Sequence, residues 1–219
     1  MARRLPSDED RLEALRRLLS GLADGADVHE LTVSIAPLHP KNNTFPGEVF
    51  MVLATQWLIT ATEEDKTALG EAGFVSAILD TRFFPSEPGA EHVRGDPHIA
   101  TLVLQFSSEG GATDAVDLLH TDGLEPCPET CAFAVEEFEI DGVSNGRGIQ
   151  RIAMQEALDR IGDVEHPPHA EYSFHFVDGL LAYDVRLSGP PDEVSLQQAE
   201  EIVTKLYERV QGAPPPPEG

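Results

Sequence analysis

The sequence predicts an α+β domain in which a largely antiparallel sheet is packed by helices. Three observations support this class. Strand-like runs outnumber helical ones, two of these runs meet at an Asp-Gly pair, and pairs of runs lead into an amphipathic helix. The 219 residues suffice to bury a sizeable core and suit one large domain or two small, closely joined halves.

The first two helical patterns lie in the N-terminal third of the chain. One begins at Ser7, carries three acidic residues in its first turn and places leucines on one face. The second is short, spans residues 63–71 and stops before Gly73. We expect both to form helices.

Two further helical patterns follow strand-like runs. A helix is expected to start near Ser108, and the clearest one begins at Ser195, where Gln198 completes a capping box. The apolar stripe of this last helix includes Val203 and Leu206, which we expect to dock on the sheet.

Strand-like runs occupy most of the remaining chain. They are residues 31–35, 74–84, 99–106, 133–140, 172–176 and 180–187. The last two meet at Val177-Asp178-Gly179, the strongest hairpin signal in the chain. Residues 49–59 fit a central strand or a buried helix, and residues 148–161 fit a strand over 149–154 followed by a helix.

These patterns divide the chain into three segments. We expect an acidic N-terminal helix in residues 1–30, a single α+β domain over residues 31–211, and a Pro-rich disordered tail over residues 212–219. The order strand, strand, helix occurs in residues 74–120 and again in residues 172–210. This order suggests two similar ββα halves, although little residue identity supports a duplication.

The charge of the chain limits its partners. The sequence has 39 acidic and 15 basic residues, a net charge of −24, which would repel a phosphate backbone and excludes a basic nucleic-acid binder. No apolar run reaches the roughly 18 residues of a membrane span. The charge favours a basic protein partner; alternatively, it only keeps the protein soluble or reflects a salty habitat.

The two cysteines, Cys127 and Cys131, lie close together in the sequence. Their spacing differs from that of a thioredoxin-like redox pair, and no second pair is present to complete a zinc site. Two interpretations stay open: a small structural disulfide in an oxidising compartment, or two ordinary thiols near the end of a strand.

Several short patterns carry a family resemblance. They are Gly73-Phe74-Val75-Ser76 at a strand start, Leu104-Gln105-Phe106 ahead of a helix with Gly111-Ala112, and the Phe176 to Gly179 hairpin. Over residues 69–210 the chain resembles the exported domains of actinobacterial surface lipoproteins of unknown function, which are similar to the Mog1/PsbP-like α+β sandwich. The resemblance implies a binding or assembly fold of the cell envelope, and it transfers no catalytic residues.

The resemblance also bears on the compartment. The N-terminus lacks both the lipobox cysteine of that family and the apolar region of a signal peptide. We expect an extracytoplasmic protein if an export signal is missing from this chain, and a cytoplasmic one otherwise.

Candidate sites for chemistry are few. The histidine pairs His166/His169 and His92/His98, the latter with Asp96 between them, are expected to lie in solvated loops, so no metal or cofactor is assigned. Asn145-Gly146-Arg147-Gly148 lacks the Lys-Ser/Thr of a phosphate loop and is expected to form a turn. The adjacent carboxylates Glu136 and Glu137 fit a solvated face.

The function expected from the sequence is therefore a non-catalytic acidic binding or assembly module. Two alternatives stay open: an enzyme whose histidine or carboxylate site the sequence does not reveal, and a cytosolic partner-binding protein. No catalytic residue is assigned, and the sequence does not specify the oligomeric state.

Overall fold

The computed structural model describes residues 33–35, 68–84, 97–124, 133–154, 158–159 and 168–212. The strands are β1 (Val33–Ile35), β2 (Phe74–Phe83), β3 (His98–Phe106), β4 (Phe133–Phe138), β5 (Arg147–Ala153), β6 (His169–Asp178) and β7 (Leu181–Gly189). The two long helices of this part are α4 (Glu109–Leu124) and α6 (Leu196–Gly212). Residues 68–71 are helical, and so are residues 158 and 159.

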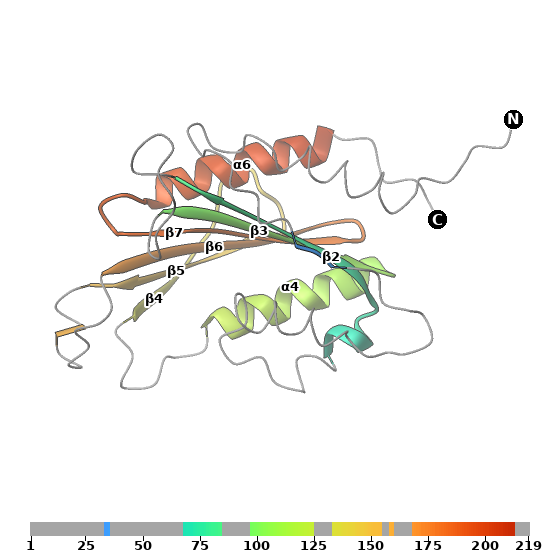
Figure 1. The fold of residues 1–219 in the computed structure, drawn as a ribbon. Helices are drawn as coiled ribbons and strands as arrows, with labels where there is room; N and C mark the ends of the chain where they lie inside the picture. The colour runs from blue at the N-terminus through green and yellow to red at the C-terminus, as the bar shows by residue number, and fades with distance from the viewer. Residues whose placement is uncertain are drawn as a thin grey trace, which may run out of the picture.

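The strands form one antiparallel sheet in the order β1-β2-β3-β7-β6-β5-β4. The helices α4 and α6 lie on opposite faces of this sheet (Figure 1). The α+β class expected from the sequence is confirmed. Within the described residues, no helix combines the length and the apolar character needed to cross a membrane.

The β6–β7 hairpin follows the Asp-Gly signal. Asp178 and Leu181 are the last paired residues, so Gly179 and Leu180 form a two-residue loop. Gly179 has a φ of 57°, a left-handed conformation that glycine adopts without a steric penalty. This loop fixes the register of the two central strands on which the candidate site depends.

Side chains of successive strand residues alternate between the two faces, and this alternation produces two cores. Ile99 and Val103 of β3 pack on the α6 side, whereas Leu102 and Leu104 pack on the α4 side. The α6 core includes the aromatic side chains of β6 and β7, and the α4 core is smaller. Each helix therefore covers one apolar surface of the same sheet.

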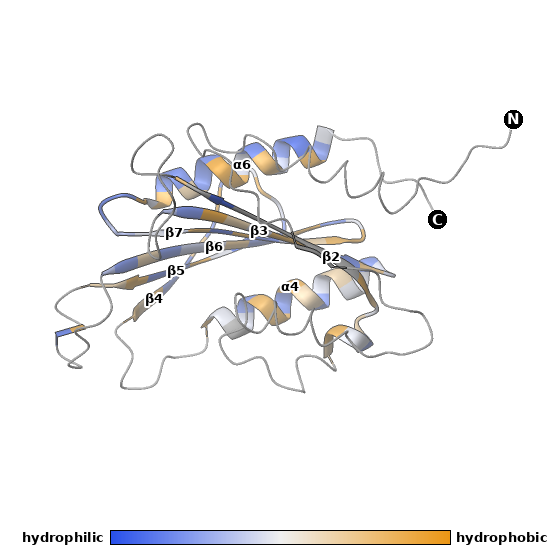
Figure 2. Cartoon of the chain, in the orientation of Figure 1, coloured by the Kyte–Doolittle hydropathy of each residue, from blue (hydrophilic) through white to orange (hydrophobic). Residues whose placement is uncertain are grey.

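The helix α6 is amphipathic (Figure 2) and starts at the predicted cap. The backbone N–H of Gln198 donates to Ser195 Oγ at 3.3 Å, which satisfies one unpaired donor of the first turn. Val203 and Leu206 are buried in the sheet core, so the docking expected for this helix is confirmed.

The order strand, strand, helix does recur, as β2-β3-α4 and β6-β7-α6. The packing does not recur, because the two helices lie on opposite faces. If the two halves were related by a two-fold rotation that exchanges the neighbouring antiparallel strands β3 and β7, both helices would lie on the same face of the sheet. The two halves are therefore not related in this way. The N-terminal helix expected in residues 1–30, the run 49–59 and the tail from residue 213 lie outside the described residues.

Candidate functional site

Charged and polar side chains gather where α4 covers β5, β6 and β7. We call this group the buried polar cluster; its members are His120, Arg151, Glu171, Ser173, His175, Asp184 and Arg186. Strand register brings the group together, since His175 stands opposite Asp184 and Ser173 stands opposite Arg186. Directly opposed residues of antiparallel strands share a face, so the cluster members on the strands all point toward α4.

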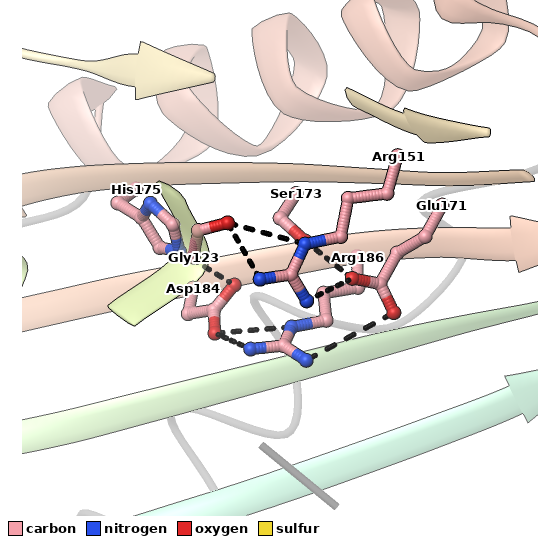
Figure 3. A network of polar contacts seen from close by, with 7 residues as sticks. All are labelled: Gly123, Arg151, Glu171, Ser173, His175, Asp184 and Arg186. Carbon is pink, nitrogen blue, oxygen red and sulfur yellow. Dashed lines mark hydrogen bonds and ion pairs between the residues drawn. The ribbon is translucent and has the colours of Figure 1, made fainter. Parts of the chain in front are cut away.

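An ion-pair chain runs through the cluster (Figure 3). Arg186 donates from Nε and Nη2 to Asp184 Oδ2, at 3.3 and 3.1 Å. Glu171 lies between the two arginines, with Oε2 at 4.0 Å from Arg186 Nη1 and Oε1 at 3.8 Å from Arg151 Nη1. The two carboxylates and the two guanidinium groups balance one another in charge.

The chain ends on the last turn of α4. Arg151 donates from Nε and Nη2 to the backbone carbonyl of Gly123, at 3.1 and 2.5 Å (Figure 3). Carbonyl groups of a helix C-terminus have no partner within the helix, and the helix dipole favours a cation there. Arg151 thus ties the end of α4 to β5.

Two histidines occupy the other side of the cluster. His175 Nε2 faces Asp184 Oδ1 across 3.3 Å as an ion-pair contact. His120 Nε2 lies 2.8 Å from Oε1 of Glu137, an exposed side chain of β4. The two imidazole rings meet edge to face, with centroids 5.8 Å apart.

The ionisation of the cluster follows from its pairing. Burial opposes the charged form of Asp184, but Arg186 and His175 outweigh it and hold the pKa of this carboxyl below its usual value. Burial also opposes the charge of Arg186, yet Asp184 and Glu171 raise its pKa. Asp184 and Arg186 are therefore a charged pair at neutral pH.

The residue types Ser173, His175 and Asp184 invite comparison with a nucleophilic triad. The Ser173 hydroxyl donates to Glu171 Oε1 at 3.4 Å, and within the described part no hydrogen bond joins it to a histidine. All three side chains are buried beneath α4. A triad needs a nucleophile bonded to its base and open to substrate, and this arrangement offers neither.

The candidate residues from the sequence lie apart from the cluster or at its edge. Asn145 has a φ of 58° and lies in a turn with Ser144. The expectation of a turn is wrong for Arg147 and Gly148, because these residues begin β5. Glu136 and Glu137 point to opposite faces of β4: Glu136 accepts from Gln150 at 3.0 Å, whereas Glu137 contacts His120. Both carboxylates belong to exposed residues, as expected.

The predicted histidine segments are described only in part. His98 begins β3 and His169 begins β6, and both residues are half-buried. The expectation of solvated loops is therefore wrong for these two histidines, because each pairs in the sheet. Burial lowers the pKa of His169, an effect that nearby Glu171 opposes and His98 reinforces. No group of three or more metal-ligating side chains occurs in the described ranges. The other predicted residues lie outside those ranges: Cys127, Cys131, His92, Asp96 and His166.

Sequence reasoning missed the buried polar cluster. Its signal was present as polar residues at alternate positions of β6 (Glu171, Ser173, His175) and β7 (Asp184, Arg186). Such alternation is typical of a solvated strand face, and only the position of α4 turns that face inward.

The fold has solved structural neighbours. The extracellular domain of PknH from Mycobacterium tuberculosis matches with a TM-score of 0.54 and 12% identity, over 95% of this chain and 98% of that domain. An uncharacterised Mycobacterium smegmatis protein, an orthologue of Rv0999, matches with a TM-score of 0.40 and 12% identity, over 90% and 95% of the two chains. No protein-family model and no curated protein matches the chain.

Proposed function

Since the chain shares its fold with an extracellular mycobacterial domain, we propose that it is a non-catalytic binding or assembly module of the actinobacterial cell envelope. The proposal extends the resemblance to exported lipoprotein domains and to the Mog1/PsbP-like sandwich. The single observation that supports a non-catalytic role is the burial of the polar cluster. Asp184 is 0% and His175 1% exposed, so substrate cannot reach them while α4 is docked.

The acidic charge of the described surface is uneven. The sequence of α4 contains four acidic residues and no lysine or arginine, whereas α6 has three acidic and two basic residues. Glu109, Asp114 and Asp117 of α4 are exposed. We call these three side chains the α4 acidic surface, and we propose that it meets a partner with a basic face.

Long-range attraction of this kind acts on the rate of association. Carboxylates at the rim of an interface speed the encounter of opposite charges more than they prolong the complex. At physiological ionic strength screening acts over about 8 Å, so added salt weakens the attraction. We propose that the protein acts outside the cytoplasm, provided that the export signal is missing from this chain. The alternative is a protein that binds its partner in the cytosol.

The test begins with capture of partners from the native host on the immobilised protein. Association kinetics of each captured partner are then measured across a salt series. The proposal predicts a basic partner whose association rate falls steeply as salt rises. The electrostatic part of the proposal is contradicted if the association rate of the partner does not change with salt concentration. It is also contradicted if a neutral small molecule is the sole ligand.

The competing enzyme hypothesis has its own outcome. Turnover of any substrate that is abolished by His175→Gln, with the fold intact, would replace the binding module with an enzyme. We expect no such turnover, because the side chain is enclosed by α4 and β7.

A further inference from the structure

The strand β4 forms an open edge of the sheet. It is the last strand in the sheet order (Figure 1), and within the described residues it pairs with β5 alone. An edge strand presents a row of backbone N–H and C=O groups with which a second chain can pair. The residues of β4 are exposed or half-buried throughout, so solvent reaches this edge.

The sheet register identifies the residues of β4 that present these groups. The β6–β7 loop closes on Asp178 and Leu181, and a two-residue hairpin loop closes on a pair that exchanges both hydrogen bonds. Such pairs alternate along each antiparallel ladder, and a residue of an inner strand bonds to only one of its two neighbouring strands. The continuous registers from β7 to β4 therefore assign Glu136 and Gln150 to a bonded pair. The residues whose backbone N–H and C=O groups point away from β5 are Phe133, Val135 and Glu137.

The protection of this edge is selective. Proteins usually guard an open edge with proline, with a β-bulge or with charged side chains. The strand β4 contains no proline and its register with β5 has no bulge, whereas its charged side chains are both glutamates. Negative charges repel an acidic strand but attract a basic one. In addition, Phe133 is 38% exposed and offers an apolar contact beside the open backbone.

The charge around the edge determines which segment fits it. Glu136, Glu137 and Glu139 are exposed. His120 of α4, which contacts Glu137 at 2.8 Å, follows Asp117 by about one helical turn, so the edge adjoins the α4 acidic surface. A second copy of this chain would bring the same glutamates and another net charge of −24, which disfavours self-pairing. A strand with lysine or arginine at alternate positions complements the edge.

We propose that the β4 edge accepts an extended basic segment of the partner as an additional strand. The backbone groups of Phe133, Val135 and Glu137 pair with the main chain of that segment, and its basic side chains lie beside the glutamates. In this mode of recognition main-chain hydrogen bonds supply affinity, and side chains at alternate positions supply specificity. The proposal rests on the proposed function, because it states how a basic partner is held.

A peptide of alternating lysine and threonine, about eight residues long, serves as the probe. It is added to the isotope-labelled protein, and hydrogen exchange of the backbone amides of β4 is followed by NMR. With the peptide at about ten times its dissociation constant, the amides of Phe133, Val135 and Glu137 should exchange about tenfold more slowly, because their N–H groups gain partners. The amides of the other three residues of β4 already pair with β5 and should change little.

Two matched controls remove the backbone pairing and keep the charges. The first is the same peptide with every backbone nitrogen methylated, which has no N–H to donate. The second is Val135→Pro, which removes an outward N–H and leaves the ladder between β4 and β5 intact, as proline on an edge strand does. We expect each change to weaken binding at least about tenfold. If Val135→Pro does not fold, the methylated peptide makes the same test on the wild type.

Strand addition and the electrostatic proposal have separate outcomes. Strand addition is overturned if the peptide does not bind, if the methylated peptide binds as tightly, or if binding leaves the exchange of the three outward amides unchanged. It is also overturned if these amides become protected without peptide as the protein concentration rises, because a second copy then occupies the edge. If the peptide adds as a strand but its association rate does not change with salt, the electrostatic part of the proposed function fails and strand addition stands.

Discussion

Asp184 offers the sharpest test of the buried polar cluster. Its side chain is fully buried, and its carboxylate takes two hydrogen bonds from Arg186 and faces His175 at 3.3 Å. Replacement by Asn keeps the shape and removes the charge. Arg186, itself 12% exposed, then loses both hydrogen bonds to a charged carboxylate, whereas its 4.0 Å contact with Glu171 remains.

Removal of one partner from a buried ion pair costs about 3–5 kcal/mol, because the other charge stays buried without compensation. We expect Asp184→Asn to lower the free energy of unfolding by that amount. With a urea dependence of about 2 kcal/mol per molar, typical of small proteins, the unfolding midpoint should fall by about 2 M. Urea titration followed by circular dichroism measures this shift.

The matched control is an exposed ion pair of similar geometry. Asp117 Oδ1 lies 3.1 Å from Arg147 Nη1, and both side chains are more than half exposed. Asp117→Asn should cost less than about 1 kcal/mol, because solvent screens the pair. If Asp184→Asn lowers the free energy of unfolding by no more than Asp117→Asn does, the ion pairs of the cluster do not stabilise the fold in the way their geometry indicates.

The pH dependence of the same variant has a defined sign. Folding lowers the pKa of Asp184, so its contribution is complete above the unfolded value of about 3.9 and is lost as pH falls through the folded value. The difference in unfolding free energy between wild type and Asp184→Asn should therefore narrow in acid below pH about 4. A constant difference down to the lowest pH at which the protein folds would contradict the assignment.

Three further predictions concern packing and the cysteines. Leu206→Ala should lower the free energy of unfolding by about 2–4 kcal/mol, as a calorimetric or urea measurement would show, because the side chain is fully buried. Gly146→Ala should destabilise by about 1–3 kcal/mol in the same assay, since a Cβ there would lie 2.4 Å from Cε1 of Phe174; a neutral effect would mean that the ring moves aside. Cys127 and Cys131 should resist alkylation after purification without reductant, and mass spectrometry that finds two modified thiols would refute the disulfide.

The elements of the fold that depend on residues close together in the sequence could be predicted from the sequence. The Asp-Gly loop of the β6–β7 hairpin and the Ser195 cap of α6 are both present. Each rests on local chemistry: a glycine that tolerates positive φ, and a hydroxyl that accepts from the first turn. The ambiguous run 148–161 also begins as the strand β5.

The features that depend on distant contacts were not predictable from one sequence. The position of β7 between β3 and β6 follows from pairing across about 80 residues of chain. The placement of α4 decides which strand face becomes buried, and without it His175 and Asp184 fit an ordinary solvated face. The candidate site was hidden for this reason, although its alternate polar residues were visible.

The central functional claim is that the α4 acidic surface meets a basic partner. The most direct measurement is the association rate constant of a captured partner with two triple variants, in which Glu or Asp is replaced by Gln or Asn. One variant neutralises Glu109, Asp114 and Asp117, and its control neutralises three exposed residues at or near α6 (Glu193, Glu201, Glu208). We predict at least a tenfold slower association at low salt for the α4 variant alone. Equal rates for the two variants, or a rate unchanged from wild type, would contradict the claim.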